Sequence, residues 1–151
     1  MAEPDEAVLF RYLNEIGIIS ALASNRFERL LPGDLTLSQF TVLNWFIRVD
    51  TEATPGRLAR AFEVTGGAMT NTLKKLEGKG LVLIEPDPHS GRQKRVTLTD
   101  AGKVLREQAI SDAFPLLREL AEALDIKAIR QQLTHLQEVR QYLDESRYRT
   151  P

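Results

Sequence analysis

Apolar residues recur along the chain at intervals of three and four, and short breaks divide this pattern into six predicted helices. The first helix covers residues 5–31, and a Pro-Gly-Asp turn at residues 32–34 ends it. A residue that can cap a helix N-terminus stands before each of the other five segments. These caps are Thr36, Thr54, Thr65, Thr99 and Asp125, and the helices that they begin are expected to end near residues 49, 62, 78, 124 and 146.

Two segments near the middle of the chain follow a strand pattern instead. Residues 81–84 form an apolar run too short for a helix, and residues 95–98 alternate between polar and apolar side chains. Residues 86–91 between them are rich in turn formers, which predicts a hairpin with a long tip. The expected fold is therefore mainly α with a small β-hairpin, in the α+β class.

Length and composition fit one globular domain with a substantial core. The chain has 151 residues, of which 42% are hydrophobic, and 20 basic residues are nearly balanced by 21 acidic ones. The absence of cysteine excludes disulfides, thiolate zinc sites and thiol redox switches. Net charge by itself indicates no particular partner.

Several classes of site have no support in the sequence. The spacing of His89 and His135 is not that of a metal-binding pair. We find no nucleophile elbow, phosphate-binding loop or dinucleotide-binding fingerprint. We therefore expect no metal, no cofactor and no enzymatic activity.

The sequence also carries no signal for a membrane or for export. No stretch of 18 uncharged apolar residues is present, and the first six residues are acidic where a signal peptide is basic. The expected location is the cytoplasm, with no membrane partner.

Basic residues are concentrated in the middle of the chain. Residues 64–99 contain six of them against three acidic residues, Glu77, Glu85 and Asp87. The six are Lys74, Lys75, Lys79, Arg92, Lys94 and Arg95. A basic patch of this kind in a nearly neutral protein indicates an anionic partner.

The two short helices at residues 55–62 and 66–78 are separated by three residues, which is typical of a helix-turn-helix. Their predicted core consists of Leu58, Ala59, Phe62, Val64, Met69, Leu73 and Leu76. At about 100° per residue, Gly67, Asn71 and Lys74 fall on the face of the second helix opposite to that core. Thr70 and Lys75 flank this polar face.

The polar face has the chemistry of a helix that enters a DNA major groove. An asparagine can bond an adenine edge, a lysine can reach guanine or phosphate, and a threonine can bond a base or touch a thymine methyl. The small residues Gly67 and Ala68 would let the helix N-terminus approach the duplex closely. The alternative is an ordinary solvated helix face, for which the same residue types are equally normal.

The hairpin that follows carries Arg92, Lys94 and Arg95 at or just after its tip. Long cationic side chains in this position can enter a minor groove or bind phosphates. An isolated charge cluster is more often a surface feature. Directly after a helix-turn-helix, however, the cluster is typical of a wing.

This order of elements resembles the MarR family of bacterial transcription regulators. The matching segments are Leu58–Ala59, residues 70–82, residues 87–92 and the Leu-Thr-Asp-Ala-Gly sequence at residues 98–102. The likeness extends over about residues 6–146. Many winged helices share the segment at 70–82, whereas the wing followed by Leu-Thr-Asp-Ala-Gly is more particular to this family.

The resemblance implies a single MarR-type domain over residues 1–151, with a winged helix-turn-helix lobe at 36–98 and dimerisation helices at 5–31 and 99–146. Such a homodimer would act as a repressor on a pseudo-palindromic operator in double-stranded DNA, with each recognition helix in a major groove and each wing in a flanking minor groove. The DNA-binding residues expected on this basis are Thr65, Gly67, Ala68, Thr70, Asn71, Lys74, Lys75, Arg92, Lys94 and Arg95.

The C-terminal segments support dimerisation independently, because they offer more apolar surface than a small winged helix can cover. This surface includes Leu116, Leu117, Leu120 and Leu124 and a near-heptad apolar seam in the last helix. The alternative is a layer of three helices within one chain.

Two residues depart from the wing pattern of the family. Ser90 stands where an aspartate is usual, two residues before Arg92, and Ile84 stands where an arginine is often found. If those two residues normally brace the wing by charge, this wing is looser or is held in another way.

The resemblance further implies a pocket for a small aromatic or amphipathic effector, placed where the dimerisation helices meet the DNA-binding lobe. Candidates by position are Phe10, Tyr12, Phe40, Trp45 and Phe46, for which core packing is the alternative explanation. A second class of function also stays open, namely a winged helix that binds a protein partner without reading DNA. A steep salt dependence of DNA binding would separate the two classes.

Overall fold

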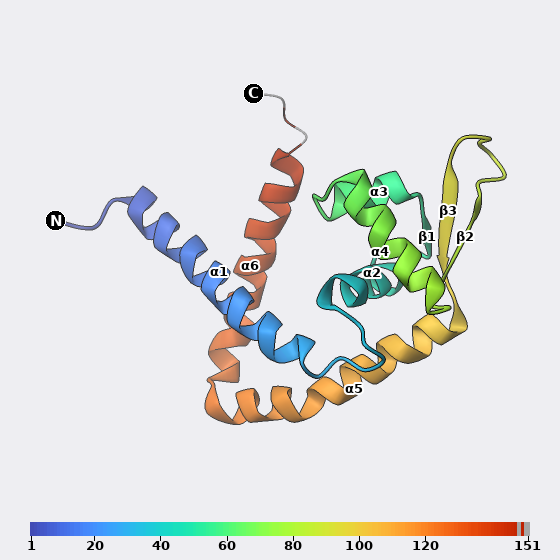
Figure 1. Ribbon diagram of the computed structural model, residues 1–151. Helices are drawn as coiled ribbons and strands as arrows, with labels where there is room; N and C mark the ends of the chain where they lie inside the picture. The colour runs from blue at the N-terminus through green and yellow to red at the C-terminus, as the bar shows by residue number, and fades with distance from the viewer. Residues whose placement is uncertain (148, 150–151) are drawn as a thin grey trace. The chain divides into compact units, whose positions relative to one another are not determined.

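The computed structural model describes residues 1–147 and 149, and within them the chain forms six helices and three short strands (Figure 1). In chain order these are α1 (Asp5–Glu28), α2 (Leu37–Arg48), β1 (Glu52–Ala53), α3 (Pro55–Ala61), α4 (Gly66–Gly78), β2 (Val82–Pro86), β3 (Lys94–Leu98), α5 (Asp100–Ala123) and α6 (Ile126–Ser146). The mainly α fold with a small β-sheet is confirmed.

Side-chain caps begin the helices where the sequence predicts them. Thr36, Thr54 and Thr65 each accept a hydrogen bond from the backbone N–H three residues later. Thr99 and Asp125 do the same for α5 and α6. Each cap satisfies a backbone donor that has no partner inside the helix, so the chain cannot begin the helix elsewhere without losing that bond.

The sheet has one strand more than the sequence predicts. Glu52 and Ala53, which lie between two predicted helices, pair with Thr97 and Val96 of β3. The resulting antiparallel order is β1-β3-β2. Two residues are too few to show an alternating pattern, so β1 depends on the strand beside it and not on its own sequence.

The buried core lies in the lobe formed by α2, α3, α4 and the sheet. Its most completely buried large side chains are Val42, Leu43, Phe46, Leu58, Leu73, Leu76 and Val96. One core prediction is wrong, because Val64 is exposed. Val64 follows Glu63, whose left-handed φ of 52° turns the chain between α3 and α4, and helical periodicity does not apply across such a turn.

The packing divides the chain into two compact units, residues 1–113 and residues 114–151. The boundary falls within α5, next to Pro115. Proline lacks the N–H that would bond one turn back, so the helix is weakest at this residue although it continues through it.

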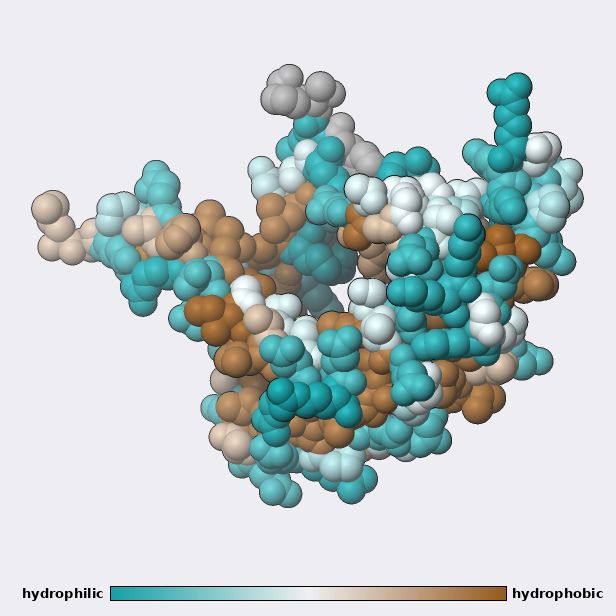
Figure 2. Space-filling view, in the orientation of Figure 1, coloured by the Kyte–Doolittle hydropathy of each residue, from teal (hydrophilic) through white to brown (hydrophobic). Residues whose placement is uncertain are grey.

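The two long terminal helices leave their apolar residues uncovered. Neither α1 nor α6 contains a buried residue. By length and composition α1 could cross a membrane, and none of that stretch is buried within the chain. The hydrophobic surface on α1 is visible in Figure 2. The most exposed apolar side chains of these helices are Val8, Leu9, Phe10, Leu13, Ile18, Ile19, Leu22, Leu133, Tyr142 and Leu143.

Two of the segments that carry the family resemblance meet at the start of α5. The Thr99 hydroxyl donates to the Gly80 carbonyl at 2.7 Å, and the Thr99 N–H donates to the Leu81 carbonyl at 3.1 Å. Gly102 lies directly over this contact, where a Cβ atom would stand 2.2 Å from the Leu81 oxygen. The glycine is therefore needed for α5 to approach the end of α4 this closely.

We predict that Gly102→Ala is destabilising and that Gly78→Ala is not. The added methyl group at residue 102 collides with backbone, and overpacking of this kind costs about 1–3 kcal/mol. At Gly78 nothing lies within 4 Å, and alanine favours the helix by up to about 1 kcal/mol. Urea unfolding of both variants measures the difference. Equal stability of the two variants would contradict this packing.

Candidate nucleic-acid interface

Helix α4 separates its apolar and polar side chains onto opposite faces. Met69, Leu73 and Leu76 are all buried in the core. Asn71 and Lys74, on the other side of the helix, are exposed. Because burial of the apolar stripe fixes the rotation of α4 about its axis, the polar face is held toward solvent.

The C-terminal end of α4 is fixed by a Schellman motif. Gly80 has a left-handed φ of 73°, its N–H donates to the Glu77 carbonyl, and the Leu81 N–H donates to the Leu76 carbonyl. Leu76 and Leu81 are both buried, which supplies the hydrophobic contact of this motif. The Gly-Leu step of the sequence therefore both ends the helix and starts the path to β2.

The remaining residues predicted to bind DNA on this lobe are exposed as well. They are Thr65, Gly67, Ala68, Thr70, Lys75, Arg92 and Lys94. Within the described residues, the side chains of Lys74, Lys75, Arg92 and Lys94 form no hydrogen bond or ion pair with the protein. These four cations present their charge to solvent.

The tip of the wing between β2 and β3 is held by Asp87. Its carboxylate accepts a hydrogen bond from the His89 N–H at 2.9 Å, and its carbonyl accepts one from the Ser90 N–H at 3.1 Å. The Asp87 N–H in turn donates to the Gln93 carbonyl. An aspartate that bonds the backbone two residues later stabilises a turn, so this tip is ordered without the usual wing aspartate at residue 90.

Arg95 differs from the other cations of the wing because carboxylates flank it. Its guanidinium lies 3.7 Å from Glu52 on β1 and 3.9 Å from Glu85 on β2. Its side chain is 33% exposed, and the Nε atom is buried without a hydrogen-bond partner in the described structure. Arg95 therefore links all three strands, and its charge is largely compensated within the sheet.

The five candidates for an effector pocket do not share one environment. Phe40 and Phe46 belong to the buried residues, and Trp45 packs edge-on against Phe46 at 5.5 Å. Phe10 is 72% exposed on α1. Tyr12 borders an open hollow on the same helix, together with Val8, Arg11, Asn14 and Glu15. A shared effector pocket stays a prediction.

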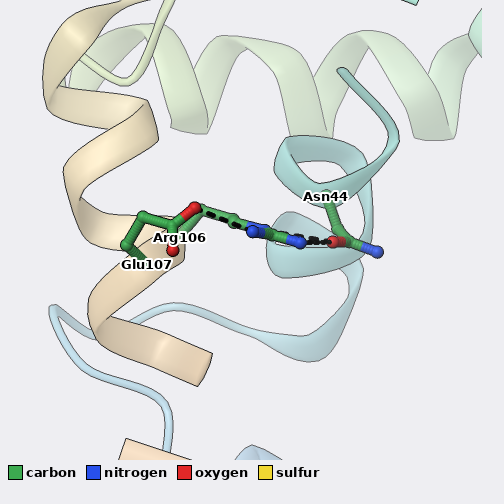
Figure 3. A network of polar contacts seen from close by, with 3 residues as sticks. All are labelled: Asn44, Arg106 and Glu107. Carbon is green, nitrogen blue, oxygen red and sulfur yellow. Dashed lines mark hydrogen bonds and ion pairs between the residues drawn. The ribbon is translucent and has the colours of Figure 1, made fainter. Parts of the chain in front are cut away.

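Sequence reasoning missed a polar link between α2 and α5. Arg106 is only 8% exposed, and its Nε and Nη2 atoms both donate to Asn44 Oδ1, at 3.1 and 2.8 Å (Figure 3). Its Nη1 atom donates to the exposed carboxylate of Glu107 at 2.8 Å. A buried arginine is stable only with such partners. No sequence motif joins residues so far apart, so only the fold reveals the pair.

Comparisons with known proteins agree with this geometry. A model of the MarR family matches residues 33–93. The multiple antibiotic resistance protein MarR of Escherichia coli strain K12 is 34% identical over 105 residues, which cover 66% of this chain and 72% of that protein. An HTH-type transcriptional repressor of Mycobacterium tuberculosis strain H37Rv is 33% identical over 109 residues, 72% of this chain and 76% of the repressor.

One similar solved structure contains DNA. It is the crystal structure of a mutant of MarR from Escherichia coli complexed with operator DNA. The two folds agree with a TM-score of 0.66 at 31% sequence identity, over 87% of this chain and 97% of the other. The likeness therefore extends over most of the chain.

We predict that Asn44→Leu destabilises the lobe more than Asn44→Leu combined with Arg106→Met. The single change leaves a buried guanidinium without its main acceptor, which costs about 1–3 kcal/mol. The double change removes the buried charge as well, and apolar replacement of buried polar partners is often close to neutral. Chemical denaturation of the three proteins measures this. A double variant no more stable than the single one would contradict the assigned link.

Proposed function

Since the chain belongs to the MarR family of transcription regulators, we propose that it represses transcription by binding operator DNA as a homodimer. The observation that carries this proposal is the polar face of α4, which the buried stripe on its opposite side holds toward solvent. The repressor name of one relative and the operator complex of another support it.

The exposed residues of α4 that are predicted to bind DNA have roles that follow from their chemistry. Asn71 is assigned to an adenine edge, Lys74 to a guanine or a phosphate, and Thr70 to a base or a thymine methyl. Gly67 and Ala68 carry too little side chain to keep the helix away from the bases. Around this base-reading centre, Thr65 and Lys75 are assigned to the phosphate backbone.

The wing is assigned to the neighbouring minor groove and its phosphates. Arg92 and Lys94 are its DNA-facing cations, because neither has a partner within the described protein. Arg95 contributes less to binding in this proposal, since Glu52 and Glu85 already compensate its charge. Its part is to keep β1, β3 and β2 together beneath the tip, in place of the bracing that Ser90 and Ile84 do not supply.

The homodimer follows from the apolar surface that the single chain leaves open. The exposed apolar side chains of α1 and α6 need a partner, and a second copy of the same helices supplies one. A dimer presents two copies of α4 to one duplex, which matches a pseudo-palindromic operator. Insertion of α1 into a membrane is the competing explanation for its apolar surface, and it would remove the protein from cytoplasmic DNA.

A small aromatic or amphipathic effector completes the proposal. Such a molecule changes DNA binding only if it binds the DNA-competent arrangement of the protein and the competing arrangement with different affinity. Of the five candidate aromatics, Tyr12 and Trp45 combine partial burial with accessible ring surface and are the first to substitute. A winged helix that binds only a protein partner is not favoured, because the relatives are named as transcription regulators.

We predict different effects for Asn71→Ala and Arg92→Ala. Loss of a base-reading amide costs about 1–3 kcal/mol of binding and relaxes preference at one base step. Loss of the wing cation weakens binding to every duplex. It also makes the fall of log affinity with log salt less steep, by about 0.9 in the slope. Titrations of duplexes selected from a random pool measure both effects, with Ser111→Ala as the control. Negligible effects of both changes would remove these assignments.

A second prediction concerns the dimer. Leu133→Glu introduces a charge into the apolar seam of α6, and we expect it to shift the protein toward the monomer and to weaken DNA binding. Gln131→Glu places the same side chain on the opposite face of α6 and serves as the control. Light scattering after gel filtration gives the mass of each species. An unmodified protein that stays monomeric at high concentration would contradict the dimer.

A further inference from the structure

Lys79 at the end of α4 is an exposed cation of the basic patch whose ammonium group is hydrogen-bonded to the protein. Its Nζ atom donates to Gln39 Oε1 at 2.8 Å and to the Asp34 carbonyl at 2.9 Å. Lys79 is also the C-cap residue of α4, so its positive charge lies at the negative end of the helix dipole. This cation has hydrogen-bond partners in the protein, unlike Lys74 and Lys75 on the same helix.

The acceptor Gln39 is itself fixed in place. Its side chain is nearly fully buried, and Oε1 also accepts the Thr36 N–H at 3.3 Å in the capping box of α2. One residue further on, the Leu37 N–H donates to Glu28 Oε1 at 3.0 Å, in the last turn of α1. The first turn of α2 is therefore the place where the end of α1 and the end of α4 are joined.

The second acceptor lies in the loop that leads from α1 to α2. Gly33 and Asp34 in this loop both have left-handed backbone angles, with φ of 63° and 55°. Such a conformation is unfavourable for aspartate and persists only where surrounding contacts hold it. The bond from Lys79 to the Asp34 carbonyl is one of these contacts, and the packing of Leu105 from α5 against Gly33 is another.

We propose that Lys79 is a positioning residue for DNA binding, which sets the C-terminal end of the recognition helix against the α1–α2 junction without contacting DNA. The proposal rests on the proposed function, because positioning matters only if α4 reads a duplex. The buried stripe of α4 fixes rotation about the helix axis, and Lys79 fixes the far end of that axis. Two of the three ammonium donors already bond the protein, so this cation is not arranged to bind phosphate.

The test compares Lys79→Met with Lys75→Met, a change of the same chemistry one turn earlier on α4. Each variant is titrated with a duplex selected from a random pool at several salt concentrations. We expect Lys79→Met to weaken binding about three- to tenfold at every salt concentration, because charge-assisted hydrogen bonds that are partly exposed are lost. The slope of log affinity against log salt stays unchanged in this variant, whereas Lys75→Met makes that negative slope less steep by about 0.9.

Two further readouts separate positioning from a general loss of stability. Lys79→Arg retains a cation of similar reach and should recover most of the affinity. Hydrogen exchange of the backbone amides at residues 34–39 should become faster in Lys79→Met and stay unchanged in Lys75→Met, since only Lys79 bonds that segment.

The outcomes distinguish this proposal from the proposed function. Failure of the unmodified protein to bind any selected duplex would overturn both. If the unmodified protein binds normally, two results would overturn the positioning role alone. One is full affinity of Lys79→Met, and the other is a less steep salt dependence of that variant. Unchanged exchange at residues 34–39 would overturn it as well.

Discussion

Burial of one apolar stripe on α4 is the constraint on which the functional surface depends. Met69, Leu73 and Leu76 pack into the core, and an α-helix allows only one rotation that buries all three. The same rotation turns Asn71 and Lys74 outward. The core therefore does more than stabilise the lobe, because it also selects the side chains that face solvent and that, in the proposed function, meet the duplex. A sequence that kept the polar residues but moved the stripe by one position would lose the interface.

The two ends of α4 are held by different means, which explains why particular small and polar residues stand near them. Thr65 caps the N-terminus, and Gly80 allows the tight turn at the C-terminus. Thr99 and Gly102 then bring α5 onto that turn at close range. In this way the start of α5 is bonded directly to the end of α4. In the proposed dimer, the placement of α4 would consequently be coupled to α5 through these few contacts.

Local signals in the sequence predict most of the fold. Five caps locate the starts of α2 to α6, because the capping bond involves residues only three apart. Features that depend on distant residues were not predictable: strand β1, the pairing of Arg106 with Asn44, and the flanking of Arg95 by Glu52 and Glu85. The sequence also does not show which basic side chains have partners within the protein and which remain available to DNA. Lys79 and Arg95 look like members of one basic patch, and only the fold shows that both have partners within the protein.

Footprinting of a selected duplex by the unmodified protein tests the central claim most directly, since it reports which grooves are occupied. Two outward α4 helices on a symmetric dimer should protect two major-groove segments about 10 base pairs apart on one face of the DNA, with minor-groove protection beside each from the wings. A single protected segment, or protection without any major-groove contact, would contradict the claim that the polar face of α4 reads DNA.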